Sequence, residues 1–298
     1  MIDTLRTLPC FKQVESISKI TSGLSQHCFK VVADNNIYFV KTIEGNTEVL
    51  VTSCAVKSGL SPNIIYHDQD WLVTRFIEAD NMALSAVNID DKISYSIRLM
   101  AQCHQLHVKP AVLSPKGLIN DLLDNSYYSQ PQKTALLALA NLLIEPIYDC
   151  KNNVCCHGDL NFSNVLMSEE LRTWLIDYEC ACNAPAEYDL AMFIAINGLA
   201  SDKVRIIIEQ YQVQSSSSVD PLLLNSYLRF GYFINALWYF NSYHQETHIE
   251  RKQALLEYAE KQWSALQSSF EQGNSTLFNS LSSKLTNILS AFNFKNQT

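Results

Sequence analysis

The hydrophobic pattern of the chain changes near residue 80, and this change limits the folds that the chain can adopt. Before it, short runs rich in β-branched and aromatic residues are separated by polar turns, which is typical of strands. We expect five such strands, over residues 17–20, 28–32, 37–42, 64–66 and 71–74. After it, apolar residues recur at helical spacing, roughly over 90–108, 131–149, 186–213, 220–245 and 249–271.

One helix interrupts the predicted strands. Residues 47–57 lack Pro and Gly and precede Gly59-Leu60-Ser61-Pro62, a helix stop signal. The chain is therefore expected to be an α+β protein with two lobes: a small β-rich lobe over 1–80 and a larger, mainly helical lobe over 81–298, with a cleft between them. The serine run at 215–218 is too short for a domain linker.

The amino-acid composition and net charge limit the kinds of molecule that the protein is expected to bind. The 298 residues are 47% hydrophobic and 17% charged, which is normal for a packed protein, and carry a net charge of -8. This balance disfavours nucleic acid or an anionic membrane as the main partner and suits a small cationic substrate. The sequence shows neither a leader pattern nor an apolar run long enough to span a bilayer, so a cytoplasmic protein is expected. Nine cysteines without paired C-x-x-C spacing argue against disulfides and zinc.

Three polar residues in the second lobe are arranged as phosphoryl transfer requires. Asp159 and Asn164 lie five residues apart in His157-Gly158-Asp159-Leu160-Asn161-Phe162-Ser163-Asn164, and Asp177 ends the apolar run 173–176. Such a reaction needs one carboxylate to orient the attacking hydroxyl, and a carboxamide plus a second carboxylate to hold magnesium. We therefore expect Asp159 to act on the hydroxyl and Asn164 and Asp177 to hold Mg²⁺. Taken singly, each could be a turn residue or a helix cap, and His157 could be a core histidine.

The first lobe offers groups for a nucleoside triphosphate, expected to be ATP. Lys41 ends the strand-like run 38–41 and could bind phosphates, with Glu48 on the next helix as its orienting partner. Gly23 and Ser25 lie in a turn that could cover the phosphates. Each feature also has an ordinary alternative, such as an edge-strand lysine, a surface glutamate or a simple turn. The segment 74–78 should offer backbone groups to the base.

The catalytic segment resembles that of the choline/ethanolamine kinase and aminoglycoside phosphotransferase superfamily. The similarity lies in His-Gly-Asp-Leu with an Asn five residues after the Asp, and in Ile176-Asp177-Tyr178-Glu179 followed by Glu187-Tyr188-Asp189-Leu190-Ala191. It extends over about residues 15–270 and includes the distance from Glu48 to the Gly59–Pro62 turn. The resemblance implies a protein-kinase-like fold that uses ATP and Mg²⁺. We expect His157 to belong with Asp159 to the catalytic residues, where it would brace the loop by hydrogen bonding.

The acceptor must be sought in aromatic segments of the C-terminal half, 232–240 and 256–259. Aromatic faces suit an ammonium group, although residues at helical spacing can also form the core. Trp238 and Tyr258 resemble the choline-kinase residues that enclose the trimethylammonium group, and the resemblance extends acceptor contacts to Tyr178 and Glu179. Asn235 stands where those kinases have another Trp, and Cys180 where they have Tyr. Choline, ethanolamine and thiamine therefore all remain candidate acceptors.

Two other functions share these residues. An aminoglycoside phosphotransferase would receive a polycationic sugar through many carboxylates, whereas this C-terminal half is more aromatic than acidic. A kinase-like protein without turnover would be favoured by loss of a catalytic group, whereas Lys41, Asp159, Asn164 and Asp177 are all present. The sequence thus favours a small-molecule kinase. It does not indicate an oligomeric state.

Overall fold

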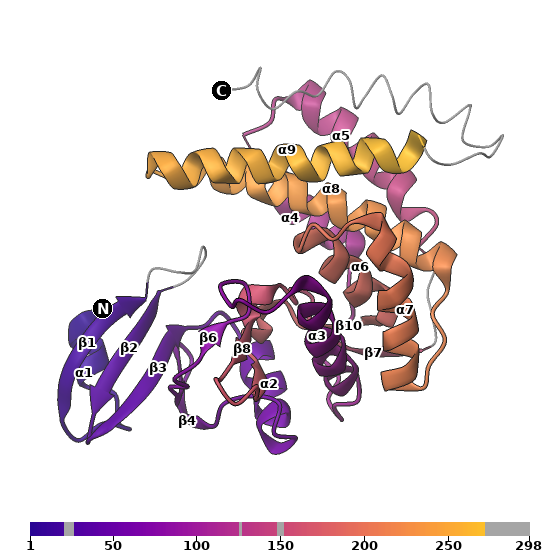
Figure 1. The fold of residues 1–298 in the computed structure, drawn as a ribbon. Helices are drawn as coiled ribbons and strands as arrows, with labels where there is room; N and C mark the ends of the chain where they lie inside the picture. The colour runs from indigo at the N-terminus through magenta and orange to yellow at the C-terminus, as the bar shows by residue number, and fades with distance from the viewer. Residues whose placement is uncertain (21–26, 125–126, 148–151, 272–298) are drawn as a thin grey trace. The chain divides into compact units, whose positions relative to one another are not determined.

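The computed structural model describes residues 1–20, 27–124, 127–147 and 152–271. These residues form two compact units: the first contains 1–20, 27–112, 152–189 and 202–218, and the second contains 113–124, 127–147, 190–201 and 219–271. The first unit thus combines the predicted strands with the catalytic segment (Figure 1). The division into functional lobes at residue 80 stays a prediction.

A five-stranded antiparallel sheet dominates the start of the first unit, as the sequence predicts. Its order is β1-β2-β3-β5-β4. The strands are β1 (Val14–Ile20), β2 (Cys28–Ala33), β3 (Asn36–Thr42), β4 (Ile64–His67) and β5 (Trp71–Arg75). Buried residues alternate along β2, which is the pattern of a strand with one face in the core. The short helix α1 (Ile2–Arg6) contributes Leu5 to that core.

Helix α2 (Thr47–Lys57) follows β3 with the bounds that the sequence predicts. The helix ends at Lys57. Gly59 follows with a positive φ of 71°, and the amide of Gly59 bonds Val56 O while that of Leu60 bonds Ala55 O. The turn after α2 is then fixed to the catalytic segment, because Leu175 N–H donates to Leu60 O at 2.9 Å and Ser61 Oγ donates to Leu175 O at 2.7 Å.

The remaining elements of the first unit surround the catalytic segment. Two small antiparallel sheets, β6-β8-β9 and β10-β7, lie beside helix α3 (Figure 1). The elements are β6 (Asp80–Asn81), α3 (Ile89–His104), β7 (Asn153–Cys156), η1 (Phe162–Asn164), β8 (Val165–Met167), β9 (Thr173–Leu175), η2 (Tyr178–Cys180), β10 (Cys182–Pro185) and α7 (Ser201–Ser215). Helix α6 (Ala186–Ile196) begins in this unit and continues into the second.

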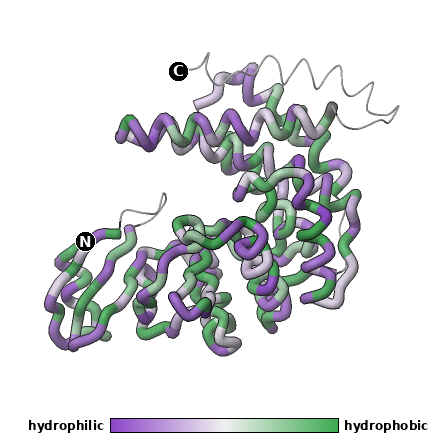
Figure 2. The backbone as a smooth tube through the Cα atoms, in the orientation of Figure 1, coloured by the Kyte–Doolittle hydropathy of each residue, from purple (hydrophilic) through white to green (hydrophobic). Residues whose placement is uncertain are grey.

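The second unit is helical. Besides most of α6, it contains α4 (Pro115–Asp124), α5 (Gln130–Ile144), α8 (Pro221–Gln245) and α9 (Ile249–Glu271). Figure 2 shows hydrophobic and hydrophilic residues interspersed along α9, as expected of a helix that buries one face. Among the described residues, none of the helices combines the length and apolar character needed to span a bilayer.

Two helix predictions need correction. The single helix expected over 186–213 is two helices, because Gly198 has φ +57° and ends α6 through bonds from Gly198 N–H to Ala195 O and from Leu199 N–H to Ile194 O. Helix α4 was not expected; it begins at Pro115, a residue favoured in the first helical turn.

Candidate active site

The predicted catalytic loop, residues 157–164, connects β7 to β8 and holds the Asp159 carboxylate by amide side chains. Asn161 Nδ2 donates to both carboxylate oxygens of Asp159 at 3.1 and 3.2 Å. Asn164 Nδ2 donates to Asp159 Oδ2 at 3.0 Å and to its backbone oxygen at 2.8 Å. The Oδ1 atom of Asn161 also accepts the amides of Ser163 and Asn164. The loop is therefore a closed turn with the carboxylate in a fixed orientation.

Asn164 and Asp177 lie at the ends of neighbouring strands. Val165 pairs with Leu175 in the β8–β9 hairpin, and Ile176 N–H donates to Asn164 O at 3.0 Å. This is the convergence of polar strand ends that the sequence predicts. Asp177 follows with φ +70°, a left-handed conformation that Asp tolerates better than most residues. Such strained positions cluster at functional sites.

Lys41, on strand β3 of the sheet, lies beside Asp177. Its buried ammonium donates to Glu48 Oε1 at 2.9 Å, bonds to Asp177 Oδ1, and lies 3.5 Å from Glu179 Oε2. The pair of Lys41 and Glu48 that the sequence predicts is thus present, while its role toward nucleotide phosphates stays a prediction. Three carboxylates face one ammonium, so the cluster carries excess negative charge.

Burial and these neighbours shift the pKa values of the site. Burial raises the pKa of Asp159 to about 7 and outweighs the Asn161 and Asn164 hydrogen bonds, which lower this pKa; the charge of Asp177 adds a smaller rise. Burial likewise raises the pKa of Glu48 to about 7 despite the Lys41 charge. Burial would lower the pKa of Lys41, but Asp177 and Glu48 outweigh it and raise that pKa. Lys41 is therefore charged, and Asp159 can exchange a proton near neutral pH.

The carboxylate cluster fits a hard divalent cation. Oxygens of Glu48, Asp177 and Glu179 all lie within 4.8 Å of one another, and Oε2 of Glu48 is buried without a hydrogen-bond partner among the described residues. Oxygen ligands are those that Mg²⁺ prefers. Because the Asn164 amide nitrogen is committed to Asp159, its amide oxygen is the atom that would act as a ligand. The residues present therefore suit the expected Mg²⁺.

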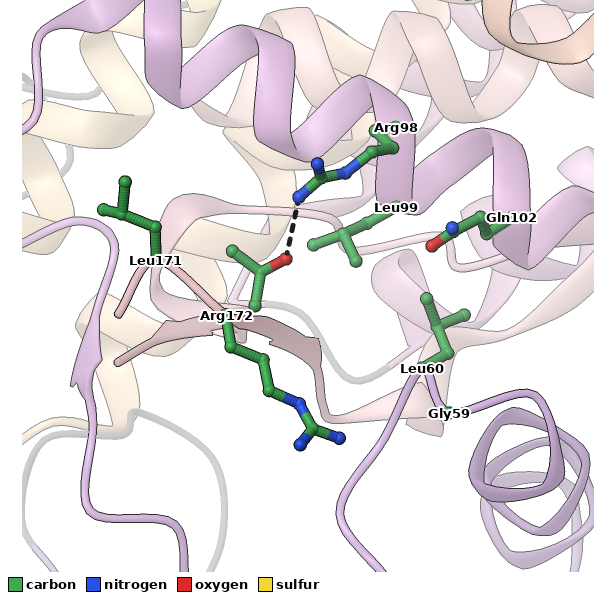
Figure 3. Close-up of a pocket in the computed structure, with 8 residues that line it drawn as sticks. Gly59, Leu60, Arg98, Leu99, Gln102, Leu171 and Arg172 are labelled. Atoms are coloured by element: carbon green, nitrogen blue, oxygen red, sulfur yellow. Dashed lines mark hydrogen bonds between the residues drawn. The ribbon is translucent and has the colours of Figure 1, made fainter. Parts of the chain in front are cut away.

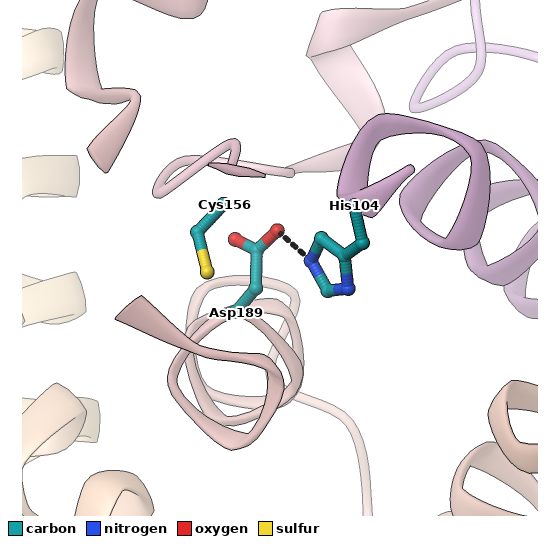
Figure 4. Close-up of side chains that lie close together, drawn as sticks. All are labelled: His104, Cys156 and Asp189. Atoms are coloured by element: carbon teal, nitrogen blue, oxygen red, sulfur yellow. Dashed lines mark hydrogen bonds and ion pairs between the residues drawn. The ribbon is translucent and has the colours of Figure 1, made fainter. Parts of the chain in front are cut away.

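A buried network that sequence reasoning missed supports the catalytic loop. Asp189, fully buried at the start of α6, accepts the amides of His157 and Gly158 at 2.9 and 2.8 Å. His104 bonds the same carboxylate through Nε2 at 2.9 Å (Figure 4). Its Nδ1 atom bonds the Tyr211 hydroxyl at 2.7 Å. Burial would raise the pKa of Asp189, but these hydrogen bonds and the His104 ring lower it. The loop backbone is thus anchored to α3 and α7.

Cys156 lies beside Asp189 and His104 (Figure 4), with donor atoms close enough for a metal. Hydrogen bonds already occupy these atoms. Both His104 nitrogens have partners, and Cys156 Sγ donates to Ala184 O at 3.5 Å. The cluster is therefore explained as a hydrogen-bonded support. The sequence did contain a sign of this network, because Asp189 lies in the segment 187–191 that resembles the kinase family. The sequence analysis assigned Asp189 no role.

His157 occupies a bracing position. Its Nε2 donates to Ile176 O at 2.9 Å, Nδ1 accepts Asp159 N–H at 3.3 Å, and burial lowers its pKa, which keeps the ring neutral. The ring therefore links the catalytic loop to the residue before Asp177. Next to it, Gly158 has φ +80°, and a Cβ there would lie 2.3 Å from Cys180 O. Only glycine fits this position.

Tyr178 requires a correction. The sequence assigned it to the acceptor, but its side chain is fully buried, its hydroxyl bonds Ser61 Oγ at 2.9 Å, and its ring centroid lies 4.9 Å from that of His157. Tyr178 therefore packs behind the catalytic loop. Glu179 contributes to the carboxylate cluster around Lys41, and its contact with an acceptor stays a prediction.

The other predicted site residues are not part of the first unit's described residues. Asn235, Trp238 and Tyr258 belong to helices α8 and α9 of the second unit, and their contact with an acceptor stays a prediction. Gly23 and Ser25 lie outside the described residues. A pocket of about 310 Å³ in the first unit is lined by residues of α3, the turn after α2 and the segment 171–173, including Arg98, which donates to Thr173 Oγ1 (Figure 3). It contains none of the predicted site residues.

Known structures share this fold. Choline kinase LicA from Streptococcus pneumoniae matches with a TM-score of 0.62 and 19% identity over 85% of this chain and 95% of its own. A choline/ethanolamine kinase family protein from Mesorhizobium loti matches with a TM-score of 0.67 and 15% identity over 98% and 99%. A spectinomycin phosphotransferase in complex with ADP and spectinomycin matches with a TM-score of 0.56 and 18% identity over 84% and 88%. These similarities confirm the expected kinase-like α+β fold.

The sequence match to an individual relative covers less of the chain than the match to the family profile. A probable choline kinase 2 of Arabidopsis thaliana is 27% identical over 148 residues, which cover 45% of this chain and 41% of that relative. The choline/ethanolamine kinase family profile matches residues 17–263, more than half of the chain and all of the site described above. The chain therefore belongs to the choline/ethanolamine kinase family.

Proposed function

We propose that this protein transfers the γ-phosphoryl group of ATP, with Mg²⁺, to a hydroxyl of a small amino alcohol of the choline, ethanolamine or thiamine type. The arrangement of Asp159, Asn164, Asp177 and Lys41 carries the proposal. Each group needed for in-line phosphoryl transfer is present in one compact unit, on elements joined by hydrogen bonds.

Asp159 is suited to receive the proton of the acceptor hydroxyl. A general base works best when its pKa lies near the working pH, and burial beside Asp177 raises the pKa of Asp159 to about 7. The amides of Asn161 and Asn164 hold its carboxylate in place, so it can also aim the attacking oxygen. General-base assistance contributes about 10²- to 10⁴-fold in rate.

Lys41 and the carboxylate cluster are suited to the nucleotide. The Lys41 ammonium would bind phosphate oxygens while Glu48 holds its position. Asn164 and Asp177 would hold Mg²⁺, which neutralises charge on the phosphates during transfer. Two similar solved structures, choline kinase LicA with AMP and spectinomycin phosphotransferase with ADP, support a nucleotide in this fold.

The acceptor is proposed to be an amino alcohol because the family and the probable choline kinase of Arabidopsis thaliana point to this class. The structural similarity to spectinomycin phosphotransferase keeps an aminoglycoside acceptor as a second candidate. The two classes differ in size and charge, so an acceptor panel separates them. A nucleotide-binding protein without turnover is the third possibility.

The test is ADP release by the purified protein with Mg²⁺ and ATP, in the presence of choline, ethanolamine, thiamine, kanamycin or spectinomycin. Release stimulated by an amino alcohol and lost in Asp159→Ala supports the proposal. Asp202→Ala, which removes an exposed carboxylate on α7, is the matched control and should retain turnover. Stimulation by an aminoglycoside alone would favour the second candidate, and ATP binding without release would favour the third.

A further inference from the structure

Two arginines line the pocket of the first unit that Figure 3 shows. Arg98 extends from α3 and Arg172 precedes β9, and every residue that lines the pocket belongs to the first unit. Among the described residues, neither guanidinium forms an ion pair with a carboxylate, whereas the exposed Arg205 of α7 pairs with Glu209 at 2.7 Å. In a chain with a net charge of -8, these two arginines form a local positive site.

Aromatic rings hold both guanidinium groups but leave most of their hydrogen-bond donors unused. Arg172 lies over the Trp174 ring at 4.8 Å from its centroid, and Arg98 lies over the Tyr95 ring at 5.2 Å. A guanidinium has five N–H donors. In the part of the chain that the structure describes, Arg98 donates one hydrogen bond, to Thr173 Oγ1 at 3.3 Å, and the Arg172 guanidinium donates none. The other donors are available to a ligand.

The rest of the lining suits the apolar part of a small organic molecule. Leu60, Leu99 and Leu171 contribute apolar side chains, and Gln102 contributes an amide. The volume of about 310 Å³ lies at the small end of the range for ligand pockets. None of the lining residues is acidic, so a positively charged substituent would find no partner there.

The two arginines favour a phosphate group over a carboxylate. A phosphate monoester carries a charge of about -2 near neutral pH and has three terminal oxygens, so it can accept hydrogen bonds from two guanidinium groups and balance both charges. A carboxylate has one charge and two oxygens, and it would leave one guanidinium without a counter-ion.

We propose that this pocket binds a small phosphate monoester whose apolar part lies against the leucines. The pocket shares no residue with the carboxylate cluster of the candidate active site. It adjoins the contacts that join α2 to β9, because Leu60 O accepts Leu175 N–H two residues before Asp177. A bound ester would therefore hold the end of α2 against β9 and stabilise the first unit.

Calorimetric titration of the whole protein with phenyl phosphate tests the proposal. At pH 8 this ester is a dianion, and low ionic strength keeps its attraction to exposed arginines weakly screened. Arg98→Gln and Arg172→Gln should each weaken binding by about tenfold or more. Arg205→Gln, which removes the same charge from an exposed position, should change the affinity by less than about threefold. Benzoate and inorganic phosphate should each bind about tenfold more weakly than phenyl phosphate, since the first is a monoanion and the second lacks the apolar part.

Each outcome decides the inference. No binding of phenyl phosphate overturns it, as does an affinity that the double arginine variant retains, which would place the phosphate elsewhere, for example at Lys41. Benzoate or inorganic phosphate that binds as tightly as phenyl phosphate would overturn the assignment of a monoester.

Thermal unfolding gives an independent readout. Phenyl phosphate should raise the Tm of wild type and of Arg205→Gln but not that of the double variant, and equal rises would overturn the proposal. Because Arg98 and Arg172 are exposed, the variants should have nearly the Tm of wild type without the ester. These measurements need no turnover, so they are independent of the proposed function.

Discussion

Asp189 should be one of the most sensitive positions of the first unit, and Asp189→Asn tests this with little change of shape. The carboxylate accepts the amides of His157 and Gly158 and bonds His104. An Asn has only one carbonyl oxygen, so at least one of these N–H groups would face an amide NH₂. Hydrogen bonds to a charged group contribute about 1.5–3 kcal/mol each, and breaking a buried charged network costs about 3–5 kcal/mol.

We therefore expect Asp189→Asn to lower the free energy of unfolding by about 3–5 kcal/mol, a large part of the roughly 5–15 kcal/mol of a typical domain. Urea denaturation at pH 7, followed by circular dichroism, measures this. Asp202→Asn, at an exposed position of α7, should stay within about 0.5 kcal/mol. A loss below about 1 kcal/mol for Asp189→Asn would show that the network does not hold the loop.

The pH dependence gives a second check. Since the pKa of Asp189 is lowered in the folded protein, the stability from its charge is present above the unfolded pKa of about 3.9 and is lost as pH falls through the lower folded value. The difference between wild type and Asp189→Asn should therefore stay constant from pH 8 to 5 and shrink only below about pH 4. A difference that disappears at pH 6 would point to another group.

Three further predictions concern the catalytic segment. Gly158→Ala should abolish turnover and lower Tm strongly, because its Cβ would meet Cys180 O, whereas Gly198→Ala, with open space around it, should cost only about 1–2 kcal/mol of conformational strain; equal Tm losses would contradict this. Turnover should rise with pH through about 7 as Asp159 ionises, and Asp159→Asn should raise Tm over wild type much more at pH 8 than at pH 4, because a pKa raised from about 3.9 in the unfolded chain to about 7 costs stability as pH rises between these two values. Tyr178→Phe should lower stability by about 1 kcal/mol through the lost Ser61 bond and leave the acceptor KM unchanged; a raised KM would restore its substrate role.

Local sequence patterns were sufficient to predict the five strands of the sheet and the close approach of Asp159, Asn164 and Asp177. The strands of the first unit alternate or concentrate apolar residues, and the Gly59 stop signal marks the end of α2. The spacing of Asp159, Asn164 and Asp177 also predicted that their side chains lie close together. Asp159 and Asn164 are joined by a closed turn, and Asn164 and Asp177 flank a tight hairpin, so their positions are fixed by short connections. Short-range patterns thus predicted the features that depend on short-range contacts.

Features that depend on distant contacts could not be predicted in this way. Asp189 acts on a loop more than 30 residues away, and His104 and Tyr211 reach it from α3 and α7. Tyr178 adjoins Asp177 in sequence, yet its hydroxyl bonds Ser61 and its ring packs against His157. Proximity to a catalytic residue in sequence therefore did not place the side chain in the site.

The charges around Lys41 indicate how nucleotide and cation binding would depend on each other. Lys41 bonds both Glu48 and Asp177, so one buried ammonium holds two carboxylates. Phosphate oxygens that bind Lys41 would compete with Asp177 for it, and the released carboxylate would add to the negative charge of Glu179 and of the phosphates. Such a group of anions is stable only with a divalent cation among them. The ion pair of Lys41 and Asp177 thus predicts that the proposed nucleotide and Mg²⁺ would bind to this cluster together.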